Sequence, residues 1–280
     1  MMNHWILLMG AGDIAHRLQP LLSAQGFNVA GARRNPPAKT DFPHIRADAR
    51  KVEDWRSLLA QQPEVIVLTL VPTAFSEEGY QQGYVEPIEA MLKALQDSDP
   101  EYLPLILFVS STSVYSERDG EWVDESTATE PDSFAGIRLL EAENLLRASA
   151  YPHTIVRFSG IYGPGREGMV ARLMSGELTV TPAWTNRIHV KDCAGVLSHL
   201  VQRFYADLGL DDVYVASDNL PIRQAEFVEG LATIMGVDAS SLPVSDKVGP
   251  RGSKRCNNAR LVESGYRFMF PTWKEGYESL

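Results

Sequence analysis

The sequence has only two cysteines, Cys193 and Cys256, and it has no apolar run of the roughly 18 residues that a transmembrane helix needs. The cysteines lack the close, paired spacing of a metal site or a disulfide framework, so we expect neither and predict a reducing compartment. The apolar run near the start covers only residues 5–9, which is too short for the core of a signal peptide. We therefore expect a cytoplasmic protein that binds no metal ion.

Positive charge is also scarce, because 26 basic residues stand against 36 acidic ones and the formal net charge is -10. Such a chain repels nucleic-acid phosphates unless basic residues cluster, and no basic stripe is present. With 280 residues, of which 44% are hydrophobic and 22% charged, the composition is that of a folded globular protein. We expect a small-molecule partner, with neither nucleic acid nor membrane, and a homodimer stays open as the assembly.

Short apolar runs rich in β-branched residues alternate with amphipathic stretches through the first 160 residues, a pattern typical of βαβ units. It predicts the α/β class with a doubly wound parallel sheet. We expect a first helix between the first two strands. The predicted strands are residues 5–9, 27–32, 44–46, 65–70, 104–110, 153–158, 178–180 and 212–216. The further predicted helices are at about 51–61, 80–97, 134–149, 168–175, 192–205 and 223–235.

The segment at residues 10–15 reads GAGDIA, follows a predicted strand directly and opens a predicted helix. It fits the G-x-G-x-x-G/A fingerprint of a dinucleotide-binding loop, and it includes Asp13 and Ile14. Gly10 permits the tight turn, Gly12 lets the backbone approach a pyrophosphate, and the small Ala15 lets the helix pack closely on the strand. The alternative is a tight strand-to-helix turn that binds nothing.

The second strand ends at Arg33 and Arg34, where an NAD-binding protein usually carries an acidic residue for the ribose 2′-hydroxyl. Two guanidinium groups suit a 2′-phosphate instead, so we predict NADP over NAD, with a pair of solvated loop arginines as the alternative. Asp48 follows the next short strand, where its carboxylate can accept a hydrogen bond from the adenine amino group or can cap a helix.

Several further segments occur in a characteristic order: VSSTSVYSE at 109–117, VRFSGIYGPGR at 156–166, RIHVKDCAGVL at 187–197, VYVASD at 213–218 and NNARLVESGYRF at 257–268. With the glycine loop, they resemble the extended short-chain dehydrogenases/reductases of the NAD-dependent epimerase/dehydratase family. The resemblance implies a Rossmann-type domain over residues 1–165, to which 187–218 return. It also implies a small C-terminal substrate-binding domain made of residues 166–186 and 219–280, and a substrate that is often a nucleotide sugar.

Enzymes of this family use a Tyr and a Lys four residues apart on one helix as acid-base pair and ribose ligand. The corresponding stretch of this chain has no such pair. One alignment places Phe134 and Arg138 there, whereas another places Ala135 and Leu139. Arg138 can hold the cofactor ribose, but its pKa above about 12 makes it a poor proton donor. The chain therefore resembles the atypical members that lack the pair.

The resemblance also implies a hydroxyl at a strand end that polarises the reacting oxygen, and its position matches Ser111. Ser110 is then expected at the cofactor and Thr112 at the substrate, although such a cluster can also satisfy backbone groups at a strand end. Two tyrosines at strand ends, Tyr115 and Tyr162, can replace the missing phenol, and we prefer Tyr162. Its alternative role is to pack against the core.

Three arginines lie in the segments that resemble the substrate side and are candidates for binding a diphosphate or a carboxylate, with solvated surface positions as the alternative: Arg166, Arg187 and Arg251. The leading hypothesis is an NADP-dependent oxidoreductase or epimerase-like enzyme that acts on a small polar substrate with a non-standard acid-base group. The second hypothesis is a catalytically silent NADP-binding sensor or regulatory protein, which the missing Tyr and Lys favour.

Overall fold

The computed structural model describes residues 4–99 and 101–280, and the chain divides into two compact units. Unit 1 consists of the described residues up to 114 together with 131–156 and 194–213. Unit 2 consists of residues 115–130, 157–193 and 214–280. Each unit therefore combines segments that are far apart in the sequence.

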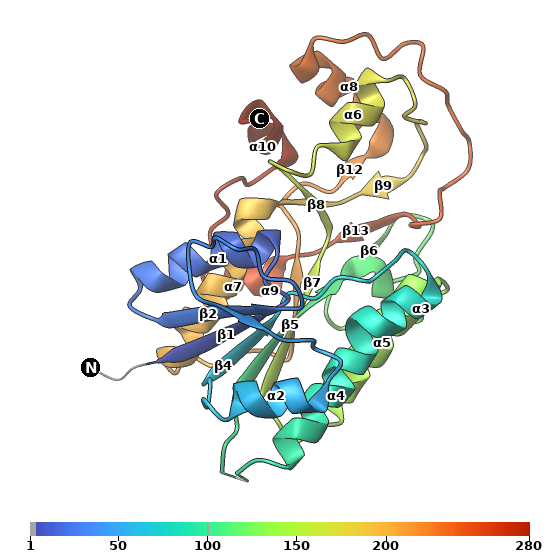
Figure 1. Cartoon of the computed structure of the whole chain (residues 1–280). Helices are drawn as coiled ribbons and strands as arrows, with labels where there is room; N and C mark the ends of the chain where they lie inside the picture. Colours follow the sequence, from blue (N-terminus) through green and yellow to red (C-terminus); the bar gives the residue numbers. More distant parts are fainter. Residues whose placement is uncertain (1–3, 100) are drawn as a thin grey trace. The chain divides into compact units, whose positions relative to one another are not determined.

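A seven-stranded sheet with the order β11-β7-β5-β4-β1-β2-β3 confirms the predicted α/β class (Figure 1). The central strands β1, β2, β3, β4 and β5 run parallel. Residues such as Leu7, Ile66 and Leu107 have no exposed surface, which explains why these strands read as continuous apolar runs. The strands are β1 (Trp5–Met9), β2 (Asn28–Arg33), β3 (His44–Arg46), β4 (Val65–Leu68), β5 (Leu105–Ser111), β7 (His153–Phe158) and β11 (Val213–Ala216).

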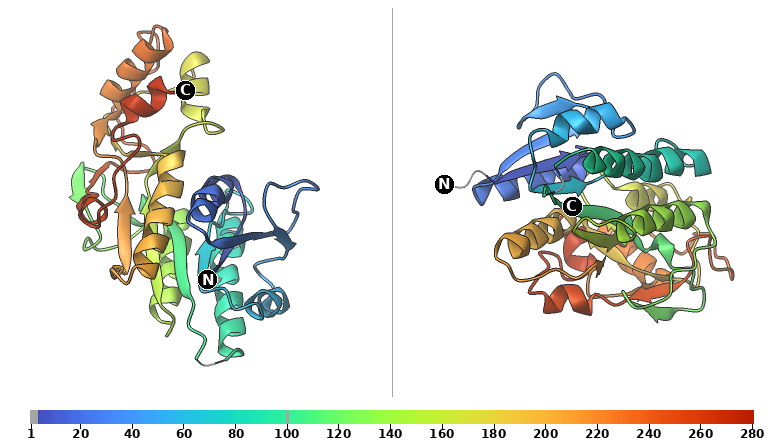
Figure 2. Two further views of the ribbon diagram at one scale, coloured as in Figure 1. Left: turned by 90° about the vertical axis from the view of Figure 1, so that its left-hand side faces the viewer. Right: turned by 90° about the horizontal axis from the view of Figure 1, so that it is seen from below.

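Helices cover both faces of this sheet. α1 (Asp13–Ala24) and α7 (Val190–Tyr205) lie on one face, where Gln25 just beyond α1 donates a hydrogen bond of 2.8 Å to Ser198 of α7. The other face carries α2 (Val52–Leu59), α4 (Glu86–Gln96) and α5 (Phe134–Arg147), and Figure 2 shows α4 and α5 side by side. The doubly wound arrangement is thus present.

The helix predicted at 80–97 has an irregular beginning. α3 (Glu77–Tyr80) leads into a π-helical turn, η1 (Gln81–Val85), and then into α4. Gly79 and Gly83 allow residues 71–74 to cross this turn in contact with its backbone. A Cβ atom on Gly79 would clash with the Ala74 oxygen, and one on Gly83 would lie 2.6 Å from the Pro72 Cα. The crossing therefore requires glycine at both positions.

Unit 2 contains three small two-stranded sheets and packs its helices around an aromatic core that includes Tyr162, Phe227, Trp273 and Tyr277. The predicted first domain includes residues 115–130, 157–165, 187–193 and 214–218, all of which belong to unit 2 in the structure. The first of these segments is held there by the pairing of β6 with β13. The elements are β6 (Glu121–Val123), β8 (Gly160–Tyr162), α6 (Gly168–Met174), β9 (Trp184–Thr185), β10 (Arg187–His189), β12 (Ile222–Arg223), α8 (Gln224–Met235), β13 (Lys254–Cys256), α9 (Ala259–Glu263) and α10 (Trp273–Glu278).

The strand predicted at 178–180 is wrong. After α6 the chain forms a turn, and only Val180 makes an isolated bridge to Val244. Leu178 is apolar because it packs into the aromatic core of unit 2, so its hydrophobicity reflects burial and not strand pairing.

Over the described residues, no helix is both long and apolar enough to span a membrane. Within the same part of the chain, no group of three or more His, Cys, Asp or Glu side chains is placed to hold a metal ion. Cys193 and Cys256 are both buried as free thiols.

Candidate cofactor-binding site

The glycine loop lies between β1 and α1 at the carboxyl edge of the parallel sheet. Gly10 has a φ of +84°, and a Cβ atom there would lie 2.7 Å from the Thr69 carbonyl oxygen. Its N–H donates to the Ala32 oxygen at 2.9 Å, and its own oxygen accepts a hydrogen bond of 3.0 Å from the Thr69 hydroxyl. β2 and the segment after β4 thus hold the turn from both sides.

The N-terminus of α1 is open to a ligand. Gly12 is its N-cap and supplies no side chain to bond the N–H groups of the first turn. A Cβ on Gly12 would meet only the Gly10 oxygen, at 3.6 Å, so the space beside it is free of other described atoms. The Asp13 carboxylate accepts a hydrogen bond of 2.8 Å from Arg17 Nε, whereas Ile14 and Ala15 are buried beneath the helix. This geometry can accept an anion at the helix dipole.

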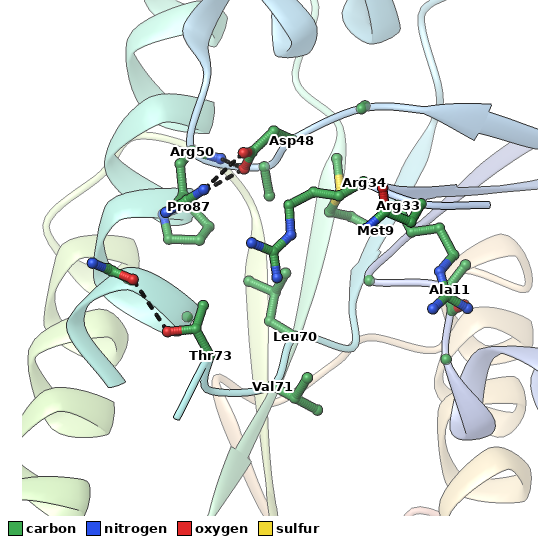
Figure 3. Close-up of a pocket in the computed structure, with 17 residues that line it drawn as sticks. Met9, Ala11, Arg33, Arg34, Asp48, Arg50, Leu70, Val71, Thr73 and Pro87 are labelled. Atoms are coloured by element: carbon green, nitrogen blue, oxygen red, sulfur yellow. Dashed lines mark hydrogen bonds and ion pairs between the residues drawn. The ribbon is translucent and has the colours of Figure 1, made fainter. Parts of the chain in front are cut away.

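A pocket opens beside this loop within unit 1 (Figure 3). The ends of β1, β2, β3 and β4 and the π-helical turn η1 all contribute to its wall. The lining residues are Met9, Gly10, Ala11, Gly12, Arg33, Arg34, Asn35, Ala47, Asp48, Ala49, Arg50, Leu70, Val71, Thr73, Gln82, Gly83 and Pro87. Such a crevice outside the carboxyl ends of parallel strands is the usual ligand position in open α/β sheets.

The two arginines at the end of β2 differ in orientation. Arg33 turns back to the glycine loop, where its Nη1 donates to the Ala11 carbonyl oxygen at 3.0 Å. Arg34 is exposed and extends toward the side of the pocket where Asp48 lies. Among the described residues the Arg34 guanidinium makes no hydrogen bond or ion pair. Its donors are therefore available to a ligand.

Asp48 lines the pocket with its carboxylate committed to Arg50. Arg50 donates from Nε at 3.1 Å, from Nη2 at 2.9 Å and from its backbone N–H at 3.1 Å. These hydrogen bonds hold the pKa of the Asp48 carboxyl below its ordinary value. Asp48 is thus an ionised acceptor whose two oxygens already have a partner.

The three hydroxyl residues at the end of β5 have different surroundings. Ser110 is buried and donates a hydrogen bond of 2.6 Å to Glu143 of α5, a fully buried carboxylate that also binds Arg147. The Ser111 oxygen accepts from the Ser113 N–H at 3.2 Å, so its own proton points elsewhere. Thr112 is buried in the short 3-10 turn that follows.

Neither residue at the position of the family's acid-base pair is free on α5. Phe134 lies in an aromatic group with Phe75 and Tyr80, with ring centroids 5.2 and 5.5 Å away. Arg138 binds Glu77 at 2.7 Å and Glu141 at 2.6 Å. In the other alignment Ala135 is aliphatic and Leu139 is buried, so neither alignment provides a proton donor.

Tyr162 belongs to the core of unit 2. Its ring stacks on Tyr277 at 4.5 Å between centroids, and its hydroxyl is buried with no hydrogen-bond partner among the described residues. Burial raises the pKa of this phenol above its ordinary value. The surroundings therefore stabilise the neutral phenol, which suits the packing role more than proton transfer.

The second candidate phenol, Tyr115, is also buried in unit 2. It donates to the Asp124 carbonyl oxygen at 2.6 Å and accepts from Arg157 at 2.7 Å, and burial is the main cause that raises its pKa. Arg187 is buried as well, with its guanidinium 3.3 Å from the centroid of the Phe227 ring. Arg166 is half-buried and Arg251 is exposed in unit 2.

Sequence reasoning missed several residues of the pocket wall, above all Arg50, Thr73 and Gln82. Leu70, Val71 and Thr73 follow directly after β4, so the rule that ligands bind at the carboxyl ends of strands would have found them. Gln82 has no comparable signal, because it reaches the pocket only through the π-helical turn, where its amide oxygen accepts from Thr73 at 3.1 Å.

Comparison with known families gives one match over most of unit 1. The NAD(P)H-binding family matches residues 10–203, which is more than half of the chain and includes the glycine loop and every residue of the pocket wall except Met9.

The similarity to individual proteins extends over nearly the whole length of the chain, as three examples show. A structure from Methylobacillus flagellatus, provisionally assigned as an NAD-dependent epimerase/dehydratase, is 35% identical, covers 99% of this chain and 97% of its own, and has a TM-score of 0.84. Protein YeeZ of Escherichia coli (strain K12) is 26% identical over 95% of this chain and 96% of that protein. Human epimerase family protein SDR39U1, solved with NADPH, is 18% identical over 98% of both chains with a TM-score of 0.78, and it shares the fold.

Proposed function

The chain belongs to the NAD(P)H-binding family, and from this premise we propose that it binds NADP(H) in preference to NAD(H). The uncapped N-terminus of α1 and the open space beside Gly12 fit the pyrophosphate of a dinucleotide. The pocket between the glycine loop and Asp48 then receives the adenosine half.

The observation that carries the preference is the exposed, unpaired guanidinium of Arg34 at the pocket. An NAD site usually has a carboxylate at the end of its second strand, whereas β2 of this chain ends in arginine. A guanidinium binds a phosphate through charge-assisted hydrogen bonds, and the 2′-phosphate is the group that distinguishes NADP from NAD.

Isothermal titration with NADPH and NADH tests this preference. We expect tighter binding of NADPH by the wild-type protein. In Arg34→Ala the affinity for NADPH should fall by about tenfold or more, while the affinity for NADH stays within about twofold. Tighter binding of NADH by the wild-type protein would contradict the proposal.

The reaction that fits best is hydride transfer between the nicotinamide and a small polar, nucleotide-sugar-like substrate, as in an oxidoreductase or an epimerase-like enzyme. The nicotinamide supplies the hydride, and Ser111 polarises the substrate oxygen, because its O–H is not used by the backbone contact with Ser113. Ser111→Ala should lower kcat by roughly 10²-fold and leave the Kd for NADPH unchanged. Burial raises the pKa of both candidate phenols, Tyr162 and Tyr115, and so disfavours each of them as the proton donor.

A second candidate function is a catalytically silent NADP(H) sensor, which the engagement of Phe134 and Arg138 favours. Incubation with 4-deuterated NADPH and a panel of ketones, aldehydes and nucleotide sugars separates the two. Deuterium in a product, detected by mass spectrometry, supports the enzyme. Intact NADPH binding without transfer to any compound supports the sensor.

A further inference from the structure

Two guanidinium groups from different segments face the same pocket. Arg34 comes from the loop after β2, and Arg50 comes from the loop between β3 and α2. Figure 3 shows the Arg34 side chain extending to the side of the pocket on which Asp48 and Arg50 lie. Arg34 is also near enough to Asp48 to help lower the pKa of that carboxyl. The three charged groups therefore form one cluster on the pocket wall.

Asp48 fixes the orientation of Arg50. The Asp48 carboxylate accepts hydrogen bonds from Nε and Nη2 of the Arg50 guanidinium, one at each oxygen. It also accepts a hydrogen bond from the backbone N–H of Arg50. The Asp48 N–H in turn donates to Asp54 of α2 at 2.7 Å, which ties the loop to the helix. Asp48 uses only one edge of the Arg50 guanidinium, and Nη1 stays available for another acceptor.

We propose that Arg50, held by Asp48, is the second arm of the phosphate-binding site and that Arg34 and Arg50 together clamp the 2′-phosphate of NADP(H). This inference rests on the proposed function. Asp48 is then a positioning residue that acts through Arg50, and the binding of the adenine amino group does not depend on Asp48. The sequence alone pointed to Arg33 as the partner of Arg34.

Arg33 is unsuited to the clamp because its guanidinium points to the glycine loop and away from the side of the pocket where Arg50 lies. Its Nη1 donates to the Ala11 oxygen, and Figure 3 shows the side chain turned toward Ala11, away from Arg34. Arg33 supports the loop that approaches the pyrophosphate, which NADP and NAD share, so it contributes no discrimination between them.

The test uses isothermal titration of the full-length protein with NADPH and NADH at one fixed ionic strength. In Arg50→Ala, we expect the affinity for NADPH to fall by about tenfold while the affinity for NADH stays within about twofold. In Asp48→Asn, we expect the affinity for NADPH to fall several-fold while the affinity for NADH stays unchanged. Unchanged NADH binding shows in each variant that the pocket is folded. Arg46→Ala is the matched control, because Arg46 is an exposed arginine of β3 outside the pocket lining, and it should change neither affinity.

Each other outcome has a defined meaning. If Asp48→Asn strengthens NADPH binding, the carboxylate repels the phosphate and the positioning role is wrong. If Asp48→Asn lowers the affinities for NADPH and NADH equally, Asp48 binds the adenine that both nucleotides share, and the inference is also wrong. If Arg34→Ala removes the NADPH preference but Arg50→Ala does not, the proposed function stands and the clamp is refuted. If the wild-type protein shows no preference for NADPH, both proposals fail.

Discussion

The ring of Phe134 packs edge-on against the ring of Phe75, with the centroids 5.2 Å apart and the planes at 65°. One turn further along α5, Arg138 binds Glu77, so two consecutive contacts attach the first turns of α5 to residues 75–80. In the alignment that places Phe134 and Arg138 at the position of the family's Tyr and Lys, both side chains thus hold a neighbouring segment. Phe134 has no proton to donate and Arg138 is held in ion pairs, so neither side chain replaces the family's acid-base pair.

The ion pairs of Arg138 lead to the first prediction. Because Glu77 and Glu141 occupy the guanidinium, Arg138→Ala should leave the affinities for NADPH and NADH within about twofold and cost about 1 kcal/mol or less of stability, as expected for exposed pairs. Titration and urea unfolding measure both quantities. If Arg138 held the cofactor ribose, as the family resemblance implied, both affinities would fall together.

The glycine loop gives a paired prediction. Gly10→Ala should destabilise the protein, because its φ is +84° and the new Cβ would clash with the Thr69 oxygen at 2.7 Å. Gly12→Ala should lose only about 1 kcal/mol or less of stability, since its Cβ would make an ordinary contact of 3.6 Å and the only cost is that alanine is a poorer N-cap than glycine. If the pyrophosphate lies against Gly12, this second variant nevertheless binds NADPH and NADH at least about tenfold more weakly. Unchanged binding by folded Gly12→Ala would contradict that position.

Tyr162 and Tyr277 form a stacked pair in which only the Tyr277 hydroxyl has a hydrogen-bond partner among the described residues. The Tyr277 hydroxyl accepts a hydrogen bond from Arg187, so Tyr277→Phe should cost about 1–3 kcal/mol of stability. Tyr162→Phe removes a buried hydroxyl without a partner, and it should keep or slightly raise the stability. Urea unfolding of the two variants side by side measures the contrast. Loss of turnover in a stable Tyr162→Phe protein would instead support a catalytic phenol.

The elements that the sequence predicted well are those that depend on local patterns. The strands at 5–9, 44–46 and 153–158 have the predicted bounds, and the helix predicted at 223–235 differs from α8 by one residue. Continuous apolar runs produce the strands at 5–9 and 153–158 because both faces of the sheet are covered by helices, whereas the strand at 44–46 reads HIR and is only partly buried. The glycine loop could be predicted for the same reason, because its fingerprint is a local pattern in which a strand, a tight turn and a helix follow one another.

The features that sequence reasoning missed depend on contacts between distant residues. The sequence around the end of β2 does not show that Arg33 turns back to Ala11 while Arg34 makes no hydrogen bond to the described residues, because side-chain torsions decide both orientations. The burial of Tyr162 results from its packing against Tyr277, which lies more than a hundred residues away. Glu143 likewise looks like a surface residue of an amphipathic helix, yet it is fully buried against Ser110.

Asp218 makes the stability of the protein depend on pH. Burial raises the pKa of its carboxyl from 3.8 to about 7, although the Leu220 N–H and the charge of Arg187 favour the ionised form. One of its oxygens is buried with no hydrogen-bond partner among the described residues. Between these two pKa values the folded protein binds more protons than the unfolded chain, so this group's contribution to stability is greatest below about pH 4 and declines as the pH rises to about 7.

Asp218→Asn should remove this decline, because the amide does not titrate and its oxygen can still accept from the Leu220 N–H. The difference in unfolding free energy between the variant and the wild type should therefore shift in favour of the variant from pH 4 to pH 7, by on the order of a few kcal/mol, and then level off. Urea unfolding at half-unit pH steps measures this difference. The pH slope is the informative quantity, because the variant also removes the negative charge near the buried Arg187 and so changes the absolute stability. A difference that stays constant between pH 4 and pH 7 would mean that Asp218 is already ionised in the folded protein at low pH.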